Sequence, residues 1–128
     1  MEFPRKTALF AIGGSAYVGL ELLYRRRSHI SMFCAGGLCF LLLGKLRAAP
    51  VPAPLRAAAG SGVITAVELT TGLLVNRDHH IWDYRNLWGN FRGQICPLFS
   101  ALWLILSAIG MALYSLAEQG INRLLPGA

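Results

Sequence analysis

The chain has 128 residues, of which 55% are hydrophobic and only 14% carry a charge, and its mean hydropathy is +0.50. A soluble domain is about one quarter charged, so this composition argues against both a soluble globule and a disordered chain. Twelve basic and six acidic residues give a net charge of +6. Because the basic residues form short clusters between apolar runs, we expect lipid headgroups, and not nucleic acid, as their acidic partner.

Four apolar stretches are long enough, or nearly long enough, to cross a bilayer as helices. A transmembrane helix needs about 20 mostly apolar residues. The runs are continuous and not alternating, which argues against the strands of a membrane barrel. The expected spans are residues 7–24, 28–44, 57–75 and 95–117. The sequence therefore predicts one all-α integral membrane domain over residues 1–128, with four transmembrane helices and both termini on the same side.

Polar segments separate the predicted helices. Arginines occupy residues 25–27, and three prolines between residues 50 and 54 favour an extended turn because proline cannot continue a helix. Residues 76–94 form the one long polar connection, and they are rich in tryptophan, tyrosine and phenylalanine. Tryptophan and tyrosine concentrate at the membrane–water boundary, so we expect an interfacial loop here.

The first and third spans resemble each other, because residues 13–22 align with residues 60–69. Each segment begins with small residues and ends on Glu-Leu, at Glu21 and Glu68. The match predicts two duplicated helical hairpins of parallel orientation, related by an axis along the membrane normal. The two glutamates would then lie at similar depth. The alternative is chance similarity among helices rich in glycine, alanine and leucine.

Glu21 and Glu68 interrupt otherwise uncharged spans. A charge inside a bilayer costs roughly 2.5–3.5 kcal/mol on insertion scales, so such groups usually face a bundle interior or a wet cavity. Small residues recur near both at four-residue spacing, including Gly19 and Gly62, which predicts that the first and third helices pack together around a polar cleft. Two close carboxylates cannot both ionise cheaply, so a shared proton could be exchanged for a cation. Alternatively, each glutamate pairs with a loop arginine or caps a neighbouring helix.

The polar loop holds two adjacent histidines and two aspartates within residues 78–83. Adjacent histidines point in different directions and no partner pair completes a tetrahedron, so we expect no metal. Asp83 either accepts hydrogen bonds from loop amides or an arginine, or joins the two glutamates in their pocket. The three cysteines lack the spacing of a metal or redox motif and are interpreted as packing residues. No nucleotide-binding or hydrolase motif occurs, so no cofactor is expected.

Several motifs together resemble one known family. They are Gly-Leu-Glu-Leu-Leu-Tyr at residues 19–24, Glu-x-Thr-Thr-Gly at 68–72, Trp-Asp-Tyr at 82–84 and Gly-Gln-Ile-Cys at 93–96, with Asn86, Asn90 and Trp103. The chain is similar to the CmpB-like family of small bacterial membrane proteins, described as type IV ABC-transporter proteins. Small animal transmembrane proteins of unassigned function carry a similar pattern. The resemblance implies a transport role in the bacterial inner (cytoplasmic) membrane. Family members often have serine where this chain has Arg85.

The basic residues do not orient the chain in the membrane. Six lie on the side of the termini and six on the side of the long loop, so the positive-inside rule gives a tie. Insertion in both orientations as antiparallel dimers is one explanation. Another is that the loop arginines belong to a pocket and should not be counted.

We therefore predict a small membrane transporter, or a transport-associated subunit, with a cation or proton site between the first and third helices. The expected partners are the lipid bilayer, a second copy in a dimer or other oligomer, and a small cationic or amphipathic substrate, with no nucleic acid. Binding is assigned to Glu21 and Glu68, and the predicted lining residues are Asp83, Tyr17, Tyr84, Trp82 and Asn86.

Two other functions stay open. The first is a membrane enzyme acting on a lipid or isoprenoid headgroup, with Asp83 or His80 as the base. Its anion or headgroup ligands would be Arg77, Arg85 and Arg25. The second is a non-catalytic scaffold subunit. The absence of a recognisable catalytic motif favours a protein that is not an enzyme.

Overall fold

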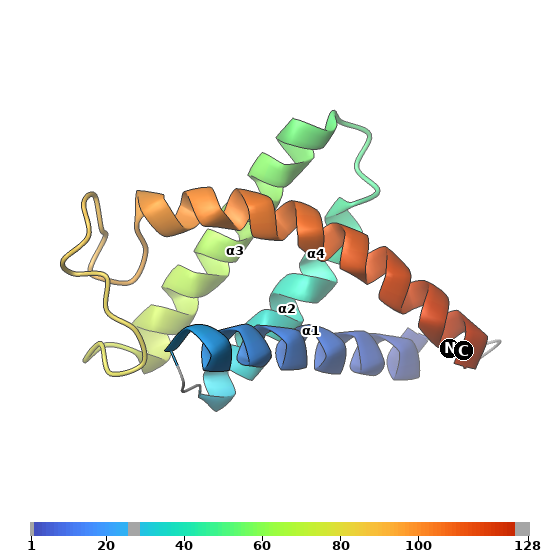
Figure 1. The fold of residues 1–128 in the computed structure, drawn as a ribbon, viewed down its shortest axis with the longest axis horizontal. Helices are drawn as coiled ribbons and strands as arrows, with labels where there is room; N and C mark the ends of the chain where they lie inside the picture. The colour runs from blue at the N-terminus through green and yellow to red at the C-terminus, as the bar shows by residue number, and fades with distance from the viewer. Residues whose placement is uncertain (1, 26–28, 125–128) are drawn as a thin grey trace.

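The computed structural model describes residues 2–25 and 29–124, which form four helices (Figure 1). These are α1 (Glu2–Arg25), α2 (Ile30–Leu46), α3 (Ala53–Val75) and α4 (Pro97–Leu124). Within these ranges the chain contains no strand beyond one isolated bridge between Phe91 and Ile95. The helices α1, α3 and α4 are long and apolar enough to cross a membrane, and α2 is a shorter apolar helix of 17 residues. The prediction of a small all-α membrane protein is confirmed.

The helices extend beyond the apolar runs that predicted them. Helix α3 begins at Ala53, with Pro52 as its N-cap and Pro54 in its first turn. Proline is tolerated there because the first backbone N–H groups of a helix have no intrahelical acceptor. Helix α4 continues past residue 117 to Leu124, and Glu118 in this extension pairs with Arg47. Long charged side chains near helix ends can reach the headgroup layer, so helix and apolar run need not end together.

The predicted packing of the first helix on the third is wrong. Among the described residues, no Cα atom of α1 lies within 8 Å of one of α3, whereas α2 contacts all three other helices. The small residues explain the error. Gly13 of α1 lies against Phe40 of α2, while Gly19 and Gly62 have nothing within 4 Å of a built Cβ. A small-residue face permits close approach, but the sequence contained several such faces, and the bundle uses others than those predicted.

The chain forms two helical hairpins that meet through α2 and α4. The closest packing is between α1 and α2 and between α3 and α4. In Figure 1 the beginning of α1 and the end of α4 lie together at one end of the molecule. There Leu9 of α1, Phe40 of α2 and Tyr114 of α4 share a buried cluster. The internal duplication itself stays a prediction.

The long loop, residues 76–96, is a folded cap on the other end of the bundle. Trp82 and Tyr84 are buried in one cluster with Met32 and Ala35 of α2, whereas Trp88 is 85% exposed. The side chain of His29, at the start of α2, lies edge-on to His80 with 6.2 Å between ring centroids. The cap therefore covers the ends of both hairpins. Its aromatic residues divide between the protein interior and the outer surface.

Candidate functional site

Glu68 is a buried carboxylate at the centre of the candidate site. Helical spacing places Ile64, Glu68 and Gly72 on one buried stripe of α3. The Glu68 side chain accepts two hydrogen bonds: Tyr84 Oη donates to Oε2 at 2.7 Å and Trp103 Nε1 donates to Oε1 at 3.2 Å. The two donors come from the cap and from α4. The prediction that this glutamate faces the bundle interior is confirmed, since only 8% of the residue is exposed.

Four aromatic rings surround the carboxylate. Tyr84 stacks on Phe99, with 4.6 Å between centroids and 8° between ring planes. The ring centroid of Trp103 lies 5.9 Å from that of Phe99 and 6.5 Å from that of Tyr17. Because Phe99 and Trp103 are four residues apart, they share one face of α4. Three separate parts of the chain thus build one aromatic wall beside Glu68.

A cavity of about 110 Å³ opens between the helices next to this wall. All four helices contribute lining residues, among them Tyr17 of α1, Cys39 of α2, Ile64 and Glu68 of α3, and Trp103 of α4. Nearly all of the other lining side chains are apolar, and among the described residues Glu68 is the single charged one in the lining. The volume is sufficient for several water molecules or a small organic group. The site therefore combines one carboxylate with aliphatic and aromatic walls.

Glu21 does not line this cavity. It is half-buried on α1, one turn after Tyr17. Tyr17 reaches the cavity by packing against Gly36 of α2, where a built Cβ would lie 2.6 Å from the tyrosine Cβ. Since α1 packs on α2 and not on α3, the predicted cleft between two carboxylates loses its structural basis. The structure instead brings Glu68 together with Tyr17 and Tyr84.

The Trp-Asp-Tyr motif places its three side chains in different environments. Trp82 is buried and its Nε1 donates to the carbonyl of Gln94 at 3.0 Å. Asp83 is exposed and accepts two hydrogen bonds from the Arg85 guanidinium, at 2.9 and 2.7 Å. These bonds hold the pKa of the Asp83 carboxyl well below its usual range. Of the two alternatives for Asp83, the structure shows the arginine pair, and it is Tyr84 that reaches Glu68.

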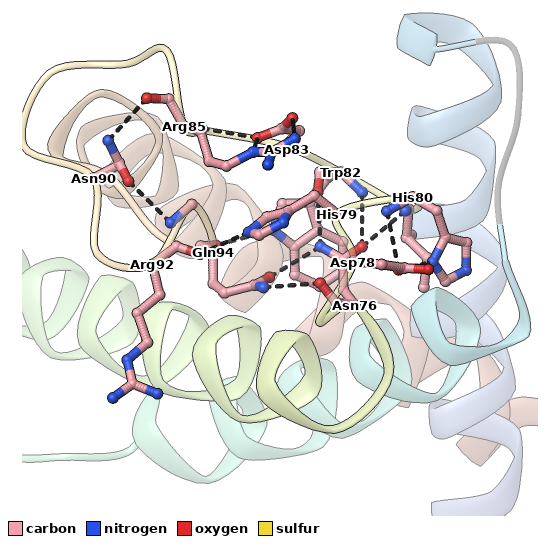
Figure 2. Close-up of polar contacts among 12 residues, drawn as sticks. Asn76, Asp78, His79, His80, Trp82, Asp83, Arg85, Asn90, Arg92 and Gln94 are labelled. Atoms are coloured by element: carbon pink, nitrogen blue, oxygen red, sulfur yellow. Dashed lines mark hydrogen bonds and ion pairs between the residues drawn. The ribbon is translucent and has the colours of Figure 1, made fainter.

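Asn76 and Gln94 form a buried polar network that the sequence did not indicate (Figure 2). Asn76 Nδ2 donates to Gln94 Oε1 at 2.9 Å and to the Trp82 carbonyl at 2.7 Å, and Asn76 Oδ1 accepts from the Ile81 amide at 2.8 Å. Gln94 Nε2 donates to the Asn76 carbonyl at 2.8 Å. This network connects the end of α3 to two segments of the cap, residues 81–82 and Gln94. It thereby positions Tyr84 over Glu68.

The network had only a weak sequence signal. An asparagine after a helix and a glutamine beside a glycine are typical of exposed loops, yet Asn76 and Gln94 are 0% and 2% exposed. The one local indication is Gly72, because a Cβ at that position would lie 2.3 Å from Gln94 Oε1. Gly72, in the last turn of α3, thus marks the place where the side chain of Gln94 packs against the helix.

The remaining predicted site residues lie on the outer surface of the cap. Asn86, Arg77 and Arg85 are exposed, and Arg77 Nε donates to the Leu73 carbonyl at 2.7 Å. The Arg25 side chain lies outside the described residues. His80 pairs with Asp78. In the described part of the chain, no three histidine, cysteine, aspartate or glutamate residues are placed to hold a metal ion.

These features define a small all-α integral membrane protein with one buried carboxylate beside an apolar cavity. Residues 21–126 match the model of the family described as "Putative ABC-transporter type IV", and the chain belongs to this family. The matched region contains Glu68, Tyr84 and Trp103. No curated protein and no solved structure matches the chain, so the resemblance to small animal proteins gains no support.

Proposed function

We propose that the protein binds a proton or a small lipophilic cation at Glu68, and that it acts as a membrane transporter or a transport-associated subunit. The observation that carries this proposal is the buried Glu68 carboxylate, held by Tyr84 and Trp103 at the wall of an otherwise apolar cavity. The transporter description of the family agrees with it. We place the protein in the bacterial cytoplasmic membrane.

The chemistry of the cavity favours a positively charged ligand. A carboxylate inside a membrane is costly, and a proton or a cation that neutralises it offsets that cost. The rings of Tyr17 and Trp103, which line the cavity, favour a cation through cation–π attraction, which is strongest where water is excluded. The other, apolar residues of the cavity lining fit the apolar part of an amphipathic cation. We therefore expect organic cations to bind better than small hydrated metal ions.

Glu21 is assigned an accessory role. It lies on α1 between Tyr17 and the cap, so a cation arriving from the cap side would pass near it. Its carboxylate attracts cations without lining the cavity. We expect Glu21→Gln to weaken transport less than Glu68→Gln does.

Flux into proteoliposomes tests the proposal. The wild-type protein should take up tetramethylammonium or tetraethylammonium in response to a pH gradient, and Glu68→Gln should abolish this uptake. Asp78→Asn is the matched control, because it makes the same carboxylate-to-amide change at an exposed cap position. If Glu68→Gln transports every tested cation as well as wild type, the proposal is wrong.

The enzyme alternative has less support. Arg85 holds the pKa of Asp83 so low that this carboxylate would be a weak general base near neutral pH. His80 already pairs with Asp78, and both residues are exposed. Neither residue lines the cavity beside Glu68. A scaffold role would instead appear as an inert protein that captures one partner, with Glu68→Gln leaving that capture unchanged.

A further inference from the structure

A second hollow lies far from the cap, where the chain passes from α2 to α3. It is a groove of about 510 Å³ with two arginines in its lining, Arg47 at the end of α2 and Arg56 in the first turn of α3. The rest of the lining is small or apolar, and α4 provides Ala108, Met111 and Ala112. The groove therefore combines basic side chains with an apolar floor.

The two arginines are held in different ways. Arg47 Nη2 donates to Glu118 Oε1 at 2.7 Å, and the Arg47 guanidinium lies 4.6 Å from the centroid of the Tyr114 ring. Arg56 Nη2 donates to the Val51 carbonyl at 2.9 Å, but its Nε is buried and has no hydrogen-bond acceptor among the described residues. A buried donor without an acceptor is destabilising. An added ligand that brings an oxygen to Arg56 would remove that cost.

The groove lies between α4 and the connection from α2 to α3. Its floor belongs to the apolar part of α4, which can cross a membrane. Arg47 follows Lys45 by two residues at the end of α2, and Arg56 lies in the first turn of α3. Basic pockets between transmembrane helices bind phosphate headgroups, and the planar guanidinium fork fits a phosphate better than a lysine does. One end of the groove thus suits a phosphate and the other an acyl chain.

We propose that this groove binds an anionic phospholipid, with its phosphate at Arg56 and Arg47 and one acyl chain along Ala108 and Ala112. Glu118 neutralises part of the Arg47 charge, so Arg56 supplies most of the attraction. This site differs from the headgroup ligands expected at Arg77 and Arg85, because Arg56 lies in the first turn of α3 and Arg77 follows its last residue, Val75. The proposal does not rest on transport at Glu68.

Lipid retention measures the phosphate contact. Protein reconstituted in mixed phosphatidylglycerol and phosphatidylcholine vesicles is extracted, and bound lipid is counted by native mass spectrometry. Wild type should retain phosphatidylglycerol in preference, and Arg56→Gln should lower that retention about tenfold, the effect of losing one charge-assisted hydrogen bond. Arg92→Gln removes a basic residue from the exposed surface of the cap and should retain lipid like wild type. Equal retention by wild type and Arg56→Gln would overturn the proposal.

A second variant tests the acyl end without touching a charge. Ala112→Leu fills the floor of the groove and should also lower phosphatidylglycerol retention several-fold, while Ala101→Leu, an exposed position on α4 outside the groove, should not. Inorganic phosphate in excess should not displace the lipid, and displacement would indicate a free-anion site instead. If Ala112→Leu converts a dimer to a monomer and leaves lipid retention unchanged, the groove is an interface between copies and the proposal is wrong.

Discussion

The two ends of the bundle handle polar groups in opposite ways. At the cap end, Asn76, Gln94 and Glu68 are buried and are bonded mainly to neutral donors and acceptors. At the end with the chain termini, Arg47 and Glu118 form an ion pair that stays about one quarter exposed. A buried network fixes one geometry, because each unsatisfied member would be costly, whereas a half-exposed ion pair tolerates rearrangement. This difference agrees with the two proposals, which are cation binding at the cap end and phospholipid binding at the other.

The largest effect should come from breaking the cap network. Asn76→Ala removes the acceptor of the Ile81 amide and the donor to Gln94, leaving buried partners unsatisfied. We expect a loss of about 2–4 kcal/mol in the free energy of unfolding. Thermal unfolding in detergent measures it, and hydrogen exchange should rise across residues 81–84. Asn86→Ala, at an exposed position, is the control, and a similar loss there would remove the distinction between buried and exposed amides.

Each end of the bundle has a glycine covered by a side chain, so the same glycine-to-alanine substitution can be compared at both ends. A Cβ at Gly72 would lie 2.3 Å from Gln94 Oε1, and one at Gly44 would lie 2.2 Å from the Tyr114 ring. Both alanine variants should destabilise by about 1–3 kcal/mol through overpacking. Gly62→Ala, where nothing lies within 4 Å, should be neutral or slightly stabilising. Melting temperatures of the three variants test this order, and an equal shift in all three would contradict the packing.

Tyr84→Phe sharpens the comparison at the carboxylate. The ring and its stack on Phe99 are kept, and only the hydroxyl that donates to Glu68 is lost. We expect about 1–3 kcal/mol of destabilisation, since hydrogen bonds to charged or buried groups lie in this range, together with reduced cation uptake. Phe99→Leu should lose stacking but keep the hydrogen bond. Wild-type uptake by Tyr84→Phe would mean that Tyr84 only fills space.

The smallest effect belongs to the surface of the cap. Asp83 and Arg85 are exposed, so Arg85→Gln should hardly change the melting temperature at neutral pH. Arg85 lowers the folded-state pKa of Asp83, so any stabilisation is complete above the ordinary aspartate pKa of about 3.9. It is lost as the pH falls from there through the lowered value. Melting curves of wild type and variant should therefore converge in acid, and divergence on acidification would contradict this sign.

The sequence predicted the helices and one half of the site, and both predictions have the same physical reason. Helix positions follow from the cost of polar groups in lipid, which acts locally, and the inward direction of Glu68 follows from the same cost. Helix pairing did not follow, because Gly13 and Gly19 look alike in sequence and only one of them is covered. The partners of Glu68 depend on the cap, whose path is set by contacts between distant residues such as Asn76 and Gln94. No local pattern encodes such contacts.

The hydroxyl of Tyr84 connects the buried carboxylate of Glu68 to a segment of the cap that reaches the outer surface. Trp88, four residues further along the same segment, presents its indole to the surroundings. If a ligand at Glu68 breaks the hydrogen bond from Tyr84, the change would be transmitted along the short backbone segment between Tyr84 and the exposed indole of Trp88. The intrinsic fluorescence of Trp88 would then report, at the outer surface, on ligand binding at the buried carboxylate.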